Sequence, residues 1–199
     1  MLYENTIKNS FMISLISPQM NLYQIYKLNN LDCKINLFNL KIISNIYFQQ
    51  VLLKNIQLNI ISYMKKNNIP KITQYSFMGL SQSIIYGYAN IYFYNKIFKN
   101  KRVSYLNILN GIKFGICRDI ISNGLPDLYK NNNKLYIITL ISIILSQGFH
   151  NCQTIMQTKN LNYINSIKYL YNKFGLHFLY KGFHNRFILF LYITFLNKL

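Results

Sequence analysis

The sequence predicts an all-α membrane protein with six transmembrane helices arranged as three pseudo-repeats. Three observations carry this prediction: three long windows without Lys, Arg, Asp or Glu, the equal spacing of these windows, and a second apolar segment after each one. The windows are residues 9–26, 72–95 and 135–158, and their starts are 63 residues apart in both intervals. A fixed period of this kind is typical of an internal repeat.

The three windows predict the first helix of each pair. A helix needs about 20 residues to cross the hydrocarbon core of a bilayer, and each window is close to or above that length. Helices of soluble proteins normally carry a charged face, which these windows lack. Their polar residues are Asn, Gln, Ser, Thr and Tyr, which can face a neighbouring helix. The alternative is a set of buried helices in a soluble all-α domain, and we favour the membrane helices.

The segments that follow the windows predict the second helix of each pair. They are Leu37–Tyr63, Tyr105–Tyr129 and Phe178–Leu199. Each is apolar but is interrupted by a few basic residues: Lys41, Lys54, Lys113, Arg118, Lys181 and Arg186. Ionisable groups at membrane depth are costly, so we expect them to face the interior of the bundle or to reach the interface.

The chain is therefore expected to form a single membrane domain over residues 1–199. Its repeats span approximately residues 9–65, 72–130 and 135–199. The short connection after the first helix of each pair is basic, which places all three connections on one side of the membrane.

The charge balance excludes several classes of function. Lys and Arg number 22 against four acids, which gives a formal net charge of +18. The acids are too few and too scattered for paired-carboxylate catalysis, and the three cysteines form no CxxC motif. His150 has no second ligand nearby in the sequence. We expect no enzyme, no catalytic residue, no metal site and no cofactor, with cardiolipin or another anionic lipid as the one bound molecule considered.

The third unit resembles the repeat of the mitochondrial carrier family. The resemblance rests on the run GFHNCQTIMQ (148–157) and on FGLHFLYKG (174–182). The second unit is similar in its spacing of Gly111 and the pair Arg118-Asp119, and the first unit has Pro18 where the family has a kinking proline. The resemblance implies a carrier-like six-helix bundle in the mitochondrial inner membrane, with Gly111, Gly175 and Gly182 as repeat-turn glycines.

The signature positions of the family are degenerate in this chain. In the family, three acids pair with three bases to close a gate at one end of the bundle. The corresponding positions here are Pro18, Met20 and Lys27 in the first unit and Gly148, His150 and Gln157 in the third. No unit keeps its carboxylate, so the resemblance implies a scaffold without the gate that allows switching.

Arg118 and Asp119 have two interpretations. The pair resembles the substrate contact of amino acid carriers, where it would hold a carboxylate and an ammonium group. It can equally be a structural pair between helices. We favour the structural interpretation, because no matching contact residues occur in the other two units.

These observations predict a non-transporting or barely transporting carrier-fold protein that serves as a structural or accessory subunit of a respiratory-chain or ATP synthase complex. The alternatives are a working solute carrier for a small anion or amino acid and, less favoured, a basic organellar ribosomal protein. Ile, Asn, Lys and Tyr make up about half of the chain, a bias typical of AT-rich organelle genes. The expected partners are membrane lipids and other subunits of a membrane complex; nucleic acid is not expected, because Arg occurs only three times, and a small-molecule substrate is not favoured.

Overall fold

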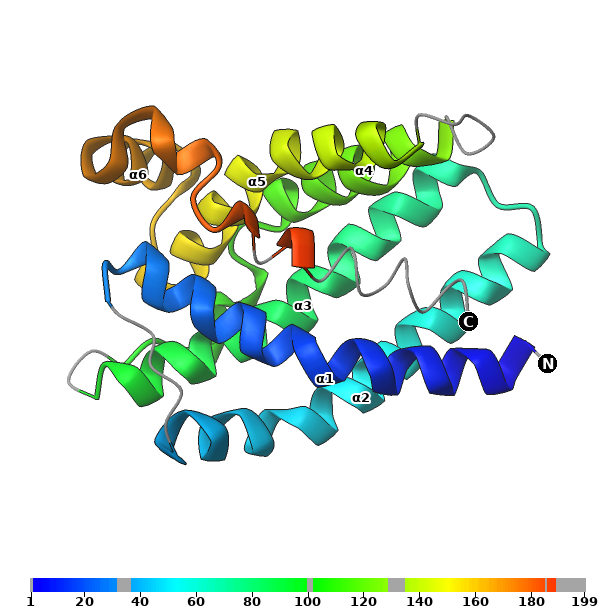
Figure 1. Cartoon of the computed structure of the whole chain (residues 1–199), viewed down its shortest axis with the longest axis horizontal. Coiled ribbons are helices and arrows are strands. Elements are labelled where there is room, and N and C mark those ends of the chain that lie inside the picture. Colours follow the sequence, from blue (N-terminus) through cyan, green and yellow to red (C-terminus); the bar gives the residue numbers. More distant parts are fainter. Residues whose placement is uncertain (1, 32–36, 100–101, 129–134, 185, 189–199) are drawn as a thin grey trace.

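Helices and short links form the whole of the described chain in a computed structural model, which describes residues 2–31, 37–99, 102–128, 135–184 and 186–188 (Figure 1). The α-helices and two short 3-10 helices (η) are, in chain order, α1 (Leu2–Leu28), α2 (Leu37–Lys66), α3 (Lys71–Ile97), η1 (Tyr105–Leu109), α4 (Ile112–Leu128), α5 (Leu135–Lys159), α6 (Tyr163–Phe174) and η2 (Gly175–Leu179).

Asparagine residues end three of the long helices. Asn30, Asn68 and Asn160 follow α1, α2 and α5, and each adopts a positive φ of 52–56°. Asparagine tolerates this left-handed conformation better than most residues, and it allows the chain to turn back on the last helical carbonyls. The backbone N–H of Leu31 accordingly donates to the carbonyl of Tyr26, and that of Ile69 donates to Met64. The helix ends are thus encoded locally.

The helices pack in two groups joined by α3. In Figure 1, α4 and α5 lie side by side along the upper edge, α1 and α2 lie below, and α3 crosses between them. The approach of α3 to α4 is close at Gly79: a Cβ placed there would lie 2.5 Å from the Cα of Ile116. Glycine at this position therefore lets the two backbones meet.

Two apolar clusters stabilise one end of the molecule. The first lies between α1, α2 and α3 and consists of Leu22, Ile25, Ile42, Ile46, Ala89, Phe93 and Tyr94; we call it the apolar cluster. The second joins the end of α1 to α5, α6 and η2 through Leu28, Cys152, Ile155, Leu170 and Phe178. Burial of these side chains from water supplies the hydrophobic stabilisation there.

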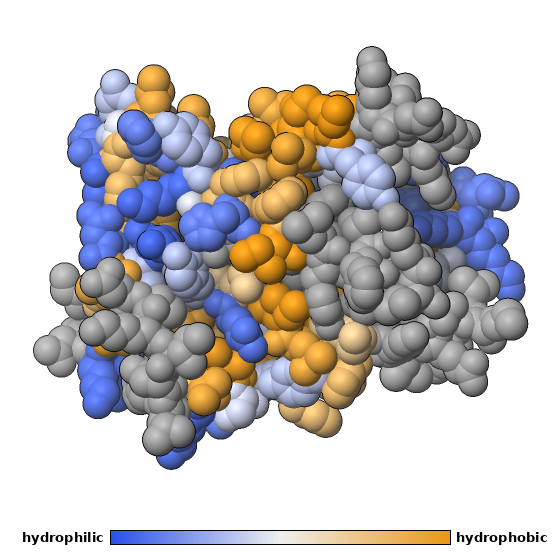
Figure 2. Space-filling model, viewed as in Figure 1, coloured by the Kyte–Doolittle hydropathy of each residue, from blue (hydrophilic) through white to orange (hydrophobic). Residues whose placement is uncertain are grey.

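Elsewhere the usual distribution of polarity is reversed. Among the described residues, buried polar side chains outnumber buried apolar ones, and many large apolar side chains are exposed. Figure 2 shows apolar side chains gathered over the upper edge, where the first half of α5 lies. The exposed residues of that half include Ile137, Ile141, Ile144 and Leu145, whereas its buried face carries Thr139, Ser142 and Ser146.

The expected bundle of six transmembrane helices is wrong. The described elements are helical, but none of the described helices contains a stretch long and apolar enough to cross a membrane. The physical reason is that absence of charge is not the same as hydrophobicity. The uncharged windows contain many Ser, Asn, Gln and Thr residues, such as Ser14, Asn21 and Gln24 in α1 and Asn151 and Gln153 in α5. Each of these residues lowers the hydropathy that a spanning segment requires.

The third pair of helices also departs from the expected pattern. The window 135–158 forms α5, but the region after it forms the short α6 and the single turn η2. Most of the expected second helix of this pair, Phe178–Leu199, lies outside the described residues. A carrier-like bundle with three equivalent pairs is therefore not what the described chain forms.

Candidate functional site

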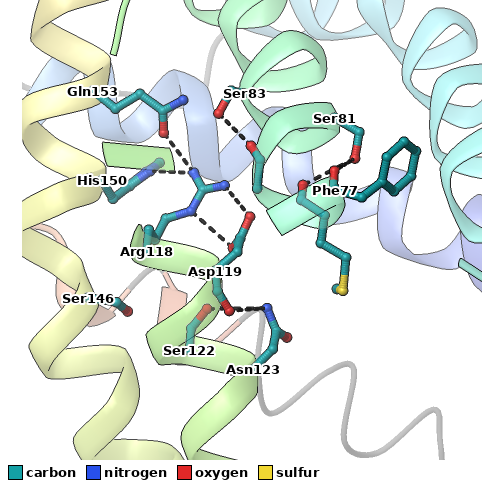
Figure 3. A network of polar contacts seen from close by, with 12 residues as sticks. Phe77, Ser81, Ser83, Arg118, Asp119, Ser122, Asn123, Ser146, His150 and Gln153 are labelled. Atoms are coloured by element: carbon teal, nitrogen blue, oxygen red, sulfur yellow. Dashed lines mark hydrogen bonds and ion pairs between the residues drawn. The ribbon is translucent and has the colours of Figure 1, made fainter. Parts of the chain in front are cut away.

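Arg118 of α4 lies at the centre of a buried network of polar contacts (Figure 3). Its Nε and Nη2 atoms donate to the two carboxylate oxygens of Asp119 at 3.1 and 2.7 Å. Its Nη1 atom donates to Oε1 of Gln153 on α5 at 3.0 Å and lies 3.4 Å from Nδ1 of His150. Adjacent residues of a helix normally point to different sides, so this forked pair forms only because both side chains turn into the space between α4 and α5.

His150 is held in a neutral form by its surroundings. Burial lowers the pKa of the imidazole well below its usual range, and the positive charges of Arg118 and Arg186 lower it further. Because a guanidinium can only donate hydrogen bonds, Nδ1 of His150 must act as the acceptor. The ring proton therefore resides on Nε2. A neutral imidazole in this position takes up one donor of Arg118 and adds no charge to the interior.

Two further cations surround this network. Lys54 of α2 is only 3% exposed and donates to Oε1 of Gln57 at 2.9 Å. The ring of Tyr86 lies 5.2 Å from its Nζ atom and 5.8 Å from Cζ of Arg118. Arg186, after η2, donates through Nη1 to the hydroxyl of Ser146 at 2.9 Å. We call Lys54, Tyr86, Arg118, Asp119, His150, Gln153 and Arg186 the charged cluster.

The charged cluster has one carboxylate for three basic side chains. Burial lowers the pKa of Lys54 to about 7, with Asp119 opposing the shift and Arg118 adding to it. Burial and the charge of Arg118 lower the pKa of Arg186 to about 10. Arg118 behaves differently: burial opposes its charge, but the Asp119 carboxylate outweighs this effect and raises the pKa. Asp119 thus stabilises the charge of Arg118 first, and Lys54 is the cation that most readily loses its proton.

The arrangement links helices rather than assembling a reactive group. Arg118 and Asp119 come from α4, and their partners come from α5, with Lys54 and Tyr86 approaching from α2 and α3. The described contact of the His150 ring is with Arg118 rather than with a carboxylate, which is the group that orients a histidine acting as a general base. Among the described residues, no three His, Cys, Asp or Glu side chains come together in a way that could hold a metal ion.

A second polar centre lies on α5 at Gln157. Its Nε2 donates to the carbonyls of Ser83 and Ile108 at 3.1 and 3.0 Å, and its Oε1 accepts from Nδ2 of Asn90 at 3.1 Å. One fully buried amide thereby joins α5 to α3 and to η1. A similar role belongs to Asn151, which donates to the carbonyls of Phe178 and Lys181 and accepts from Gln24.

The signature positions considered in the sequence lie in different surroundings. His150 joins the charged cluster and Gln157 joins the second polar centre. Pro18 is buried inside α1, and Lys27, at the end of that helix, lies over the ring of Tyr23 at 5.1 Å. The remaining positions, Met20 and Gly148, take part in packing: Met20 is partly buried, and a Cβ on Gly148 would lie 3.0 Å from Cδ2 of Leu179. These residues do not form one gate-like group.

The glycines expected at turns share a backbone conformation. Gly111, Gly175 and Gly182 have φ values of 78°, 57° and 79°. Side chains other than that of asparagine rarely adopt this conformation, so glycine is required for the backbone at these points. Gly111 precedes α4 and Gly175 ends α6, so two of the three set helix boundaries.

Sequence reasoning found the Arg118–Asp119 pair but did not assign its partners. Gln153 is noted in the sequence only as a residue at a degenerate signature position of the third unit, and Tyr86 is not singled out, because uncharged polar residues are common throughout the windows. Lys54 and Arg186 were noted only as interruptions of apolar segments. The sequence does offer one signal for them, namely a single basic residue within an otherwise uncharged segment. Basic residues are usually exposed on charged helix faces, so their repeated occurrence in uncharged segments indicates buried cations.

The comparisons with known proteins add no relative. No family model, no curated protein and no solved structure matches this chain. The resemblance to mitochondrial carriers therefore stays a prediction from the sequence.

Proposed function

We propose that this protein is a non-catalytic accessory subunit that binds to a larger protein assembly through the outward faces of α2 and α5. The observation that carries this proposal is the reversed polarity of α2 and α5. In the middle of α2 (residues 48–60) and along most of the first half of α5, the buried side chains are mainly polar and the exposed ones are mainly large and apolar. Contiguous exposed apolar surface of this kind marks an interaction site in a folded protein.

The outward face of α2 is a continuous apolar stripe. Phe48, Leu52, Ile56 and Ile60 recur every fourth residue and are all exposed, Phe48 to 76%. Residues four apart lie on the same side of a helix, so this stripe extends over about 18 Å at 1.5 Å per residue. The inward face of the same helix carries Gln50, Lys54 and Gln57. The stripe therefore lies on the side of α2 that faces away from its buried polar residues.

The partner expected at this stripe is an apolar helix flanked by acidic residues. A stripe with helical spacing fits the apolar face of another helix by side-chain interdigitation. The net charge of +18 favours a partner that is acidic around this contact, because like charges at the rim would slow association and weaken it. The charged cluster supports the subunit role from inside, since its contacts join α4 to α5 and bring Lys54 of α2, the helix that presents the stripe, against Tyr86 of α3.

A photo-crosslinking residue placed at Leu52 tests this proposal in cells that contain the native partner. We expect a crosslink to one defined segment of another protein, apolar along one face and acidic at its ends. Leu52→Glu and Ile56→Glu should remove the larger species from native electrophoresis, because they place charge at the centre of the contact.

Leu176→Glu is the matched control, because Leu176 is 65% exposed on η2 and belongs neither to the stripe on α2 nor to the outward face of α5. It should leave the larger species intact. Migration of the unmodified chain only as a free monomer would overturn the proposal. Crosslinks from position 52 only to lipid or to a second copy of the chain would also overturn it.

The remaining predictions concern location, partners and alternative functions. A location in the mitochondrion and attachment to a respiratory-chain or ATP synthase complex rest on the resemblance to carriers and on the composition, and they stay predictions, as do anionic lipids among the partners. The solute carrier and the organellar ribosomal protein remain the alternatives, and no contact in the described chain favours either over the accessory subunit.

A further inference from the structure

We propose that a pocket at the junction of α3, η1, α5 and α6 binds a small organic phosphate monoester. The pocket has a volume of about 530 Å³, within the range of about 300–1,000 Å³ found for small-molecule sites. The residues that determine its chemistry are Tyr94, Arg102, Ser104, Asn107, Lys159 and Tyr169. None of its lining residues belongs to the charged cluster or to the apolar stripe of α2. A ligand site here goes beyond the proposed function.

The described lining of the pocket is positively charged. Arg102 and Lys159 contribute two cations, and none of the described lining residues is Asp or Glu. Two described carboxylates form ion pairs away from the pocket: Asp119 pairs with Arg118, and Asp127 pairs with Lys71. Two cations facing one cavity repel each other, and a dianion between them would remove that repulsion.

Lys159 is held in place by aromatic rings. Its Nζ atom lies 5.7 Å from the ring centroid of Tyr94 and 5.2 Å from that of Tyr169. The two cation–π contacts fix the ammonium group at the wall of the pocket. A fixed charge loses less side-chain entropy when it binds an anion than a freely moving surface lysine would.

The backbone next to Arg102 is tied to α3. Asn95, near the end of α3, accepts from the backbone N–H of Val103 at 2.7 Å and donates to its carbonyl at 2.9 Å. At another part of the lining, Asn160 adopts a positive φ and accepts from Asn110 at 3.0 Å. These hydrogen bonds set the backbone positions beside both cations of the pocket.

The volume and the polar groups select the ligand. A phosphate monoester carries up to two negative charges and three terminal oxygens, which match the fork of Arg102, the point charge of Lys159 and the amide and hydroxyl groups of Asn107 and Ser104. A phosphate ion alone would leave most of the volume empty. Tyr169 and Leu161 supply apolar lining for an organic group attached to the phosphate.

Calorimetric titration of the purified full chain with adenosine monophosphate, ribose 5-phosphate and inorganic phosphate tests this inference. We expect both esters to bind and inorganic phosphate to bind more weakly. Arg102→Gln and Lys159→Gln should each weaken ester binding about tenfold or more, because each removes a charge-assisted hydrogen bond. Affinity should also fall as salt is added.

Lys168→Gln is the matched control, because Lys168 is exposed on α6 and does not line the pocket. It removes the same charge and should change affinity less than about twofold. Circular dichroism confirms that each variant is folded.

Three results would overturn the inference: no ester binding at about 10 mM, equal binding of adenosine without its phosphate, or equal loss in Lys168→Gln. Vesicles containing phosphatidic acid distinguish a lipid headgroup from a soluble ester. Binding to such vesicles without binding to the soluble esters would also overturn it.

Discussion

The apolar cluster and the charged cluster both involve α2 and α3, but they stabilise the fold by opposite means. The first buries side chains such as Ile46 and Phe93 and depends on the area removed from water. The second buries Arg118, Asp119 and Lys54 and depends on each group finding a partner. Loss of one contact in the apolar cluster leaves a cavity, whereas loss of one partner in the charged cluster leaves a buried charge. The two clusters should therefore respond differently to single and double substitutions.

The largest expected effect is that of Asp119→Ala. It leaves the Arg118 guanidinium buried beside Lys54 and Arg186, so it should lower the free energy of unfolding by about 3–5 kcal/mol. Urea denaturation measures this change. The double variant Arg118→Met/Asp119→Leu should recover most of the loss, because a buried ion pair can be replaced by apolar residues of similar size. Lys71→Ala is the control: the Lys71–Asp127 pair is largely exposed, so its loss should cost less than about 1 kcal/mol.

Ile46→Ala in the apolar cluster should lower the free energy of unfolding by about 2–5 kcal/mol through lost burial and a remaining cavity. The difference from Asp119→Ala should appear when a second residue of the same cluster is also replaced. A second truncation at Ile25 should destabilise the protein further rather than restore stability, and the same urea experiment would detect it. Recovery by a second truncation would mean that the two clusters do not differ in the way described.

Gly79→Ala tests the close contact of α3 with α4. A Cβ on Gly79 meets backbone atoms of α4, so we expect a loss of about 1–3 kcal/mol in thermal or urea unfolding. Gly124→Ala is the matched substitution on α4, because its Cβ would meet only the Tyr75 ring at 3.6 Å. That variant should be neutral or gain up to about 1 kcal/mol from helix propensity. Equal effects at both positions would argue against a tight α3–α4 approach.

Burial of Lys54 in the charged cluster should also make the stability depend on pH. The pKa of Lys54 falls from 10.5 in the unfolded chain to about 7 in the folded protein, so the unfolded state binds more protons between these values. Stability should therefore rise from pH 7 towards pH 10 by up to about 1.4 kcal/mol per pH unit and be lost again as the pH falls to 7. Lys54→Met should remove this slope, whereas Lys65→Met, at an exposed position of α2, should keep it. If the free energy of unfolding depended on pH equally in Lys54→Met and in the unmodified chain, the burial of Lys54 would be contradicted.

The helices could be predicted from the sequence because their limits are local. The uncharged windows begin and end at lysines, and Lys27, Lys96 and Lys159 indeed lie at or near the ends of α1, α3 and α5. The environment of these helices could not be predicted in the same way. The prediction of membrane crossing took missing charge as a sign of lipid contact, whereas Ser14, Gln50 and Asn151 are buried against other helices of the same chain.

The candidate site was predictable only in part. Arg118 and Asp119 stood out as adjacent opposite charges in an apolar segment. Their partners Gln153 and His150 lie more than 30 residues further along the chain, and Lys54 more than 60 residues before them. Contacts over such separations depend on how α2, α3, α4 and α5 pack, and no local pattern in a single sequence records that packing.

By itself, the sequence determined the positions of α1, α3 and α5 and the ends of several helices, because windows without charge, asparagines that tolerate positive φ and turn glycines act within a few residues of the chain. Only the tertiary structure decided which face of each helix is buried. That choice reverses the usual rule, since the free energy of the interior comes to a large extent from paired polar groups. Pairing of this kind requires side chains from separate helices to meet within hydrogen-bonding distance, which is a property of the packed molecule.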